Sequence, residues 1–186
     1  CSIPSSDVRE KKEEVLKTYE NKELGRLIIK EYPTGTATIN TIRNHLEKLE
    51  LKSFIPSLII IDYADIMRST HRYDTMRHEL KFIYEEIRNL AMDINVPIWT
   101  ASQANRDSAN SDIVGLENMS EAYGKAMVAD VVISLSRKAT EKSSGIGRIF
   151  VAKNRAGKDG VLFPMKIDTS MSKIEALDGC DELTLN

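Results

Sequence analysis

The sequence lacks the features that mark several classes of protein. No apolar run approaches the roughly 20 residues of a membrane span, and the N-terminus carries no signal-peptide core. The two cysteines, Cys1 and Cys180, lie near opposite ends, so there is neither a disulfide framework nor a CxxC zinc pattern. These absences predict a protein that works in a reducing cytoplasm.

Patterns for several kinds of catalysis are also missing. The three histidines, His45, His71 and His78, form no HExxH or related metal-binding spacing. No G-x-S-x-G nucleophile elbow is present either. The formal net charge of −2 excludes a globally basic nucleic-acid-binding protein, although a local basic strip remains possible.

What is present is ordinary for a globular chain. The 186 residues are 41% hydrophobic and 29% charged, enough for one domain with a core. The chain begins with Cys1 rather than methionine, which favours an engineered, processed or partial chain over a complete natural protein.

An unbroken apolar run, Leu58 to Ile61, ends on Asp62. Such a run predicts a strand buried on both faces, as in a parallel sheet. Ligands of open parallel sheets bind beyond the carboxyl ends of the strands, where Asp62 would emerge. From this stretch alone, a cap of the following turn explains Asp62 equally well.

A crossover unit follows this strand. Apolar residues at helical spacing predict helices over 38–51 and 74–94, and the second helix leads into an apolar strand over 96–101. A strand, a crossover helix and a second strand imply a parallel pair. Asp62 and Gln103, which follow the two strands, should therefore lie side by side at one sheet edge.

The remaining elements are predicted more simply. We expect a peripheral helix over 6–21, a short strand over 27–29, a short helix over 120–127, and strands over 128–136, 148–153 and 161–168. The Asp159–Gly160 pair predicts a hairpin between the last two strands, and Pro164 predicts that the last one lies at an edge.

Three features of the strand ends suggest phosphate chemistry. Asp62 suits an outer-shell partner of Mg²⁺, and the Gln103 amide can sense a γ-phosphate or a positioned water. Lys153 and Arg155 share a strand face within a segment, Arg137 to Lys158, that holds seven Lys and Arg against one acid. Taken alone, Gln103 is better explained as a strand-end residue bonded to backbone, and the basic segment as a solvated hairpin. No acidic cluster lies nearby in sequence to balance the two cations.

The order of these parts resembles a known family. "LIIIDYADIM", a long helix, "VPIWTASQANR", "VADVVISLSR" and "VAKNRAGKDG" together resemble the RecA-like motor domain of DnaB-type hexameric replicative helicases. The stretch from Gly25 to Leu49 looks most similar to the replicative helicases of tailed phages. The resemblance spans about Gly25 to Asp168 and implies an α/β fold, a mostly parallel RecA-like sheet with flanking helices and a C-terminal hairpin.

The resemblance implies a role for each candidate residue. Asp62 would be the Walker B aspartate on the Mg²⁺ side of ATP, and Gln103 would couple the nucleotide state to DNA-binding loops. Lys153 and Arg155 would reach the γ-phosphate bound by the neighbouring subunit. Asn105, Arg106 and Lys125 would belong to the region that faces single-stranded DNA.

The sequence departs from the family in two ways. No G-x-x-x-x-G-K-[ST] phosphate loop occurs, and no apolar strand ending in a catalytic glutamate precedes Leu27. We expect these parts upstream of Cys1, so that the chain is an incomplete motor domain, inactive alone. Its parts would be a helical segment (1–24), the C-terminal portion of the motor (25–176) and a tail (177–186).

Three functions remain open. The first is part of an ATP-driven helicase that encircles single-stranded DNA as a homo-hexamer, in bacterial or phage-infected cytoplasm, with primase and a helicase loader as possible partners. The second is a RecA-type recombinase or another RecA-like ATPase. The third is a degenerate RecA-like module that binds DNA or a partner without hydrolysing nucleotide.

Overall fold

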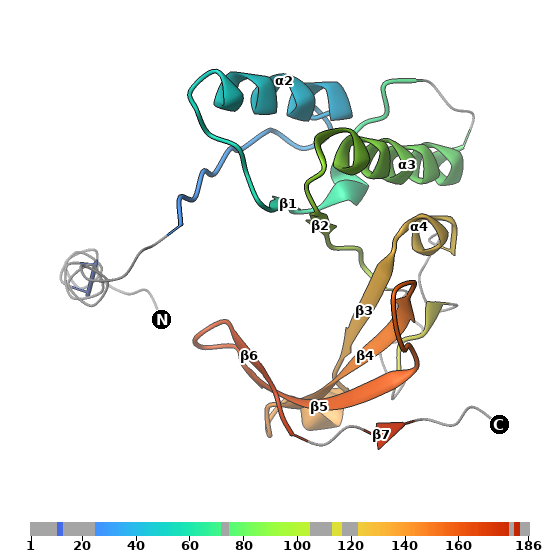
Figure 1. Ribbon diagram of the computed structural model, residues 1–186. Helices are drawn as coiled ribbons and strands as arrows, with labels where there is room; N and C mark the ends of the chain where they lie inside the picture. Colours follow the sequence, from blue (N-terminus) through green and yellow to red (C-terminus); the bar gives the residue numbers. More distant parts are fainter. Residues whose placement is uncertain are drawn as a thin grey trace. The chain divides into compact units, whose positions relative to one another are not determined.

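The computed structural model describes residues 11–12, 25–71, 75–104, 113–116, 123–178 and 181–182 (Figure 1). The chain divides into two units, Cys1–Tyr32 and Pro33–Asn186. In the first unit, Lys11 and Lys12 are helical, and the rest of the helix expected over 6–21 lies outside the described residues.

The strand expected over 27–29 is wrong. Residues 25–32 have no regular secondary structure, and the side chains of Leu27 and Ile29 are 82% and 78% exposed. An extended apolar segment becomes a strand only when a neighbour completes its hydrogen bonds. No strand of the described residues pairs with this segment.

Two amphipathic helices agree closely with their predicted ranges. Helix α2 spans Ile39–Glu50 and begins at a capping box, in which the side chains of Thr38 and Thr41 each accept a hydrogen bond from the other's backbone N–H. Helix α3 spans Met76–Ile94 and ends at Asn95, which adopts the left-handed conformation at φ 51°. In the described part of the chain, no helix is long and apolar enough to cross a membrane.

The parallel strand pair is confirmed. Strand β1 (Ile59–Ile61) pairs in parallel with β2 (Ile98–Thr100), with Ile59 opposite Ile98, and α3 connects them. A 3₁₀ turn, η1 (Ala64–Ile66), follows β1.

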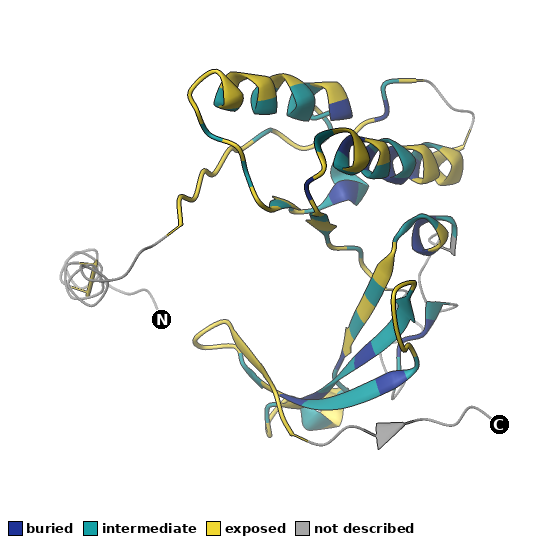
Figure 2. Ribbon diagram, in the orientation of Figure 1, coloured by how far each residue is buried: buried dark blue, intermediate teal, exposed yellow. Residues whose placement is uncertain are grey.

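Burial of β1 and β2 on both faces is wrong for the described residues. The buried core contains Ala64 of η1 and residues of both helices, and Ile61 and Ile98 pack against it. The alternate residues point to the other face, where Ile60 and Trp99 are 70% and 62% exposed (Figure 2). Among the described residues, the helices therefore cover one face of this pair.

The C-terminal half forms an antiparallel sheet. Short helix α4 (Tyr123–Val128) leads into β3 (Val131–Ser136), and the 3₁₀ turn η4 (Ala139–Glu141) precedes β4 (Ile146–Asn154). Strands β5 (Val161–Asp168), β6 (Lys173–Ala176) and β7 (Asp181–Glu182) complete it, in the order β3-β4-β5-β6 with β7 also on β5. The predicted hairpin joins β4 to β5. Gly160, in the turn of this hairpin, has a positive φ of 70°.

The expectation that Pro164 marks an edge strand is wrong. Strand β5 has β4 on one side and both β6 and β7 on the other. Proline fits there because residue 164 lies between the stretch paired with β6, which begins at Met165, and the stretch paired with β7, which ends at Leu162. The carbonyl of Pro164 still accepts a hydrogen bond from the Leu177 N–H. The predicted α/β class is confirmed, with two parallel strands and a larger antiparallel sheet among the described residues.

Candidate functional site

Asp62 and Gln103 both follow the carboxyl ends of neighbouring parallel strands. Ile61 is opposite Thr100, so Asp62 leaves β1 where β2 also ends, and Gln103 lies three residues beyond Thr100. Both side chains are exposed. The topology therefore brings the two residues to the same edge, as the sequence predicts.

The Thr100 hydroxyl connects the two strand ends. It donates to the Ile61 carbonyl at 3.0 Å and accepts from the Ala64 N–H at 2.9 Å. One side chain at the end of β2 thus satisfies backbone groups on both sides of Asp62, which fixes the turn that presents its carboxylate. The Asp62–Tyr63 peptide bond in this turn is cis.

The surroundings of Asp62 suit an outer-shell metal partner. The Asp62 carboxylate is exposed, and the described residues contain no group of three or more His, Cys, Asp or Glu that could hold a metal ion. A single accessible carboxylate cannot enclose a cation. It fits Mg²⁺, which keeps several waters and takes its other ligands from substrate phosphates.

A buried polar network includes Asp65 and Ser102, which lie close in sequence to Asp62 and Gln103. The sequence did not predict it. The Lys125 ammonium is 2.8 Å from the Asp65 carboxylate, and the two side chains are 3% and 18% exposed. Asp65 also accepts hydrogen bonds from the Tyr84 hydroxyl at 2.7 Å and the Ser102 hydroxyl at 3.0 Å. A tyrosine on the apolar face of α3 was the available signal, because a buried phenol needs a polar partner.

The burial of Lys125 bears on its expected contact with DNA. Its ammonium is paired with Asp65, bonded to Ser102 at 3.4 Å and lies 5.5 Å from the centre of the Tyr84 ring. Reaching a phosphate would require leaving a buried carboxylate unpaired, which is costly. This arrangement favours a structural role for Lys125, and its contact with DNA stays a prediction.

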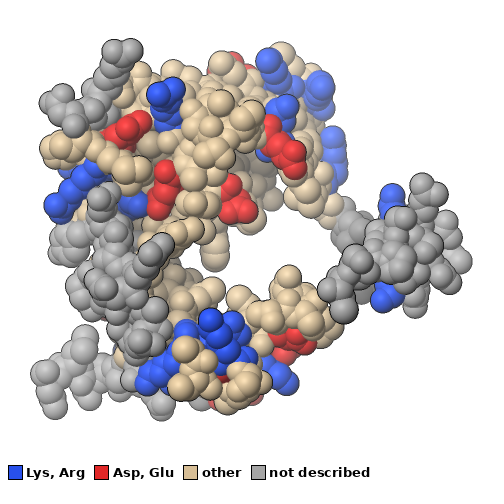
Figure 3. Space-filling view, turned by 180° about the vertical axis from the view of Figure 1, so that it is seen from behind, with Lys and Arg blue, Asp and Glu red and all other residues tan. Residues whose placement is uncertain are grey.

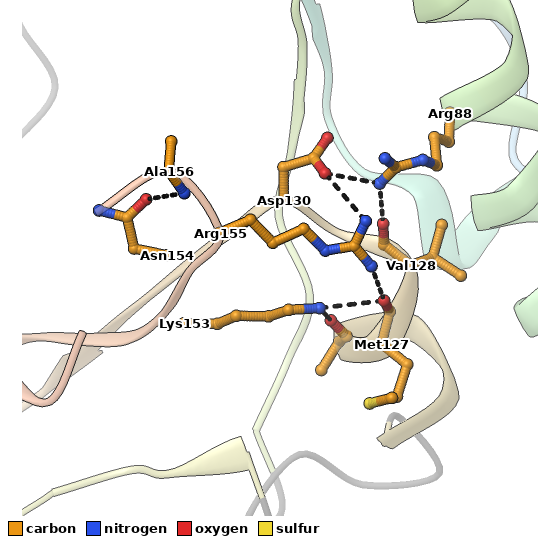
Figure 4. Close-up of polar contacts among 9 residues, drawn as sticks. Arg88, Met127, Val128, Asp130, Lys153, Asn154, Arg155 and Ala156 are labelled. Carbon is orange, nitrogen blue, oxygen red and sulfur yellow. Dashed lines mark hydrogen bonds and ion pairs between the residues drawn. The ribbon is translucent and has the colours of Figure 1, made fainter. Parts of the chain in front are cut away.

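Lys153 and Arg155 point toward the C-terminal end of α4 (Figure 4). The Lys153 ammonium donates to the carbonyls of Ala126 and Met127 at 2.9 and 3.0 Å. The Arg155 guanidinium donates to the Met127 carbonyl at 2.9 Å, so the two cations share an acceptor. Desolvation, followed by the nearby Arg155 charge, lowers the pKa of Lys153.

The two cations also have an anionic neighbour, which the sequence around them does not indicate. Arg155 Nη1 is 3.3 Å from the Asp130 carboxylate, and Arg88 of α3 is 2.7 Å from the same oxygen. Arg88 further donates to the Val128 carbonyl. Asp130 precedes β3, which pairs with β4, so the fold supplies a counter-charge that is 25 residues away in sequence.

Part of the basic segment is likewise neutralised within the chain. Arg148 binds Glu141 through two hydrogen bonds of 2.8 and 2.6 Å. The bond from Arg148 is the main reason that the pKa of Glu141 falls to about 2.

Figure 3 shows Lys and Arg side chains gathered on the antiparallel-sheet part of the chain, with acidic side chains among them. Asn105 and Arg106 lie outside the described residues.

Comparison with known proteins gives several related sequences. A DnaB-like replicative helicase of Enterobacteria phage T4 is 37% identical over 124 residues, which cover 62% of this chain and 25% of that protein. A probable replicative DNA helicase of Trieres chinensis is 28% identical over 150 residues, 75% of this chain and 33% of its own length. The chain thus spans about a quarter to a third of these relatives.

Solved structures agree on the fold. One of them, described as an ATPase domain, superposes with a TM-score of 0.65 at 20% identity, covering 76% of this chain and 52% of that one. A DnaB-like replicative helicase, described with its interactions with primase, gives 0.61 at 18% identity over 71% of this chain and 34% of its own. The family described as DnaB-like helicase C terminal domain matches residues 2–175. The chain belongs to this family, as its resemblance to the replicative helicases of tailed phages predicts.

Proposed function

We propose that this chain is part of an ATP-driven replicative DNA helicase that unwinds duplexes by moving along single-stranded DNA as a homo-hexameric ring. One observation carries the proposal. Asp62 and Gln103 emerge together from the carboxyl ends of two parallel strands, the position at which sheets of this class bind ligands. Membership of the DnaB-like family supports the same reading.

In this proposal, Asp62 orients the water shell of the Mg²⁺ that accompanies ATP. The metal neutralises charge on the phosphates during transfer, which depends mainly on positioning and electrostatics. Thr100 holds the turn that presents Asp62, which would keep the carboxylate in a constant position for this role. The phosphate loop and the base would come from residues that this chain does not contain.

Gln103 would pass the nucleotide state toward DNA. Its amide can accept from one group and donate to another, so it can respond to the γ-phosphate or to its loss. Asn105 and Arg106 follow within three residues, so few residues would separate the one that senses the nucleotide from those that contact DNA. Lys153 and Arg155 would reach the γ-phosphate held by the neighbouring subunit.

A variant of Asp62 tests the proposal. In the full-length protein, Asp62→Ala should reduce Mg²⁺-dependent ATPase by about 10² or more, because the metal loses its oriented water shell. Asp178→Ala, which removes another exposed aspartate, is the matched control. The 186-residue chain alone should turn over essentially no ATP.

Two outcomes would contradict this. Robust Mg²⁺-dependent turnover by the isolated chain, lost on Asp62→Ala, would mean that the phosphate cradle lies within these residues. An intact protein that binds DNA but hydrolyses no nucleotide would support the degenerate module instead.

A second prediction concerns the segment after Gln103. Arg106→Ala should weaken single-stranded DNA binding and make it less sensitive to salt, because one phosphate contact is lost. Nucleotide affinity should stay unchanged. Fluorescence anisotropy with a labelled oligonucleotide over a salt series measures the DNA affinity and its dependence on salt. Unchanged DNA affinity would mean that the DNA binds elsewhere on the protein.

Primase and a helicase loader are the proposed protein partners. The support for primase is one structural neighbour, a DnaB-like helicase described with its interactions with primase. Co-migration of the full-length protein with its cognate primase in size-exclusion chromatography would test this pairing.

A further inference from the structure

The buried pair formed by Asp65 and Lys125 joins elements that come from distant parts of the sequence. Asp65 lies in η1, just after the Asp62 turn, and Lys125 lies in α4. Ser102, which bonds to both, directly precedes Gln103. Tyr84 of α3 completes the network. One network therefore connects both strand ends of the candidate site to α4.

Helix α4 makes a second set of contacts at its C-terminal end. The carbonyls of Ala126, Met127 and Val128 accept from Lys153, Arg155 and Arg88 respectively, with Met127 also accepting from Lys153 (Figure 4). The Arg155 backbone N–H donates to the Asp130 carbonyl at 2.9 Å, just past the helix. Lys153 and Arg155 are thus held by the helix that carries Lys125.

The shortness of α4 makes these two sets of contacts mechanically dependent. The helix has six residues, and Lys125 and Met127 lie two apart within it. At a rise of about 1.5 Å per residue they belong to the same helical turn. A displacement of Lys125 must therefore move the carbonyls that hold Lys153 and Arg155.

We propose that Asp65 and Lys125 are positioning residues that couple the Asp62–Gln103 edge to the Lys153–Arg155 pair through α4. The proposal rests on the proposed function, because it assigns the link between a subunit's own nucleotide and the cations it presents to its neighbour. A displacement of Gln103 would move Ser102 and, through it, the Asp65–Lys125 pair. The pair would then move α4 and the Arg155 side chain that α4 holds.

The protonation of Tyr84 supports this arrangement. Burial, followed by its bond to Asp65, raises the pKa of the phenol. Tyr84 therefore keeps its proton and remains a donor to Asp65 at neutral pH. The carboxylate is held from two sides, which leaves Lys125 a fixed partner.

A double variant separates positioning from plain stabilisation. Asp65→Asn with Lys125→Met removes both charges, while the Asn carbonyl still accepts from Tyr84 and its amide can donate to Ser102. The matched control is Arg43→Gln with Asp93→Asn, which removes an exposed pair of the same 2.8 Å length between α2 and α3. Both are made in the full-length protein.

The first readout is amide hydrogen exchange at Ala129 and Arg155. Their N–H groups donate to the Lys125 and Asp130 carbonyls, so they report on α4 and its contact with the end of β4. In the double variant both should exchange about tenfold faster, while β4 amides and the control variant stay unchanged. The second readout is the DNA-stimulated ATPase rate, which should fall about tenfold with nucleotide affinity unchanged.

The outcomes are decisive in either direction. A double variant with wild-type exchange at both amides and wild-type stimulation overturns the proposal and leaves the pair a stabilising contact. If the double variant does not fold, Ser102→Ala replaces it, since it removes the shared hydroxyl and keeps the ion pair. Faster Arg155 exchange then supports the proposal, and unchanged exchange overturns it. A wild-type protein without ATPase would refute the proposed function, and exchange alone would still decide the positioning role.

Discussion

Arg155→Ala in the full-length protein should lower the DNA-stimulated ATPase rate by about 10³ to 10⁵-fold, the range that an arginine finger supplies. This corresponds to roughly 4 to 7 kcal/mol of barrier. Folding and nucleotide affinity should change little, because the Arg155 side chain is about half exposed and its contacts are with one carboxylate and one backbone carbonyl. A coupled-enzyme ATPase assay with and without single-stranded DNA measures the effect.

The control for this variant is Lys142→Ala. Lys142 is an exposed cation of the same basic segment and is the C-cap residue of η4. Removing it should leave the rate close to wild type. Equal losses in both variants would mean that the segment acts through its total charge and that Arg155 has no special position.

Mixing subunits tests whether Arg155 acts on its neighbour. Rings that contain Arg155→Ala and Asp62→Ala subunits have some interfaces with an intact nucleotide side facing an intact Arg155. Such rings should regain activity that neither variant has alone. No recovery in rings shown to be mixed would mean that Arg155 acts within its own subunit or not at all.

Lys125→Met should destabilise the protein by about 3 to 5 kcal/mol, the cost of leaving one partner of a buried ion pair behind. Methionine has a similar length, so the loss reports the stranded Asp65 charge more than a cavity. Among the described residues, the Tyr84 and Ser102 hydroxyls would remain to stabilise that carboxylate. Urea unfolding at neutral pH measures the loss.

Adding Asp65→Asn should restore most of the lost stability, because the uncompensated charge disappears. Lys158→Met, at an exposed position, is the control for the substitution itself. A loss below about 1 kcal/mol for Lys125→Met would be typical of a solvated surface pair and would show that water reaches Asp65.

The sequence predicted the parts of this structure that depend on local pattern. The three-four spacing of apolar residues located α2 and α3 within a few residues. The unbroken run before Asp62 and the helix that follows it predicted the parallel pair, and hence the common edge that Asp62 and Gln103 share. Their functional roles remain predictions, as do those of Lys153, Arg155, Asn105 and Arg106.

The features that the sequence did not predict depend on partners far along the chain. Nothing close to Asp65 in the sequence indicates its role, because Lys125, which pairs with it, lies sixty residues later. Asp130 was overlooked for the same reason, since only β3–β4 pairing brings it to Arg155. Local composition also could not show that residues 27–29 lack a strand partner among the described residues, or that β5 has neighbours on both sides of Pro164.

The contacts of Asp130 have a consequence for how a finger could work in repeated cycles. Asp130 binds Arg88 and Arg155 at once, so its carboxylate keeps a cation when Arg155 leaves. An exposed pair such as Arg155–Asp130 is worth about 0 to 1 kcal/mol. Arg155 is therefore held in a defined direction, and breaking its pair with Asp130 costs little. Moving to a phosphate would be an exchange of one anion for another, close to thermoneutral at the start and reversible when the phosphate departs.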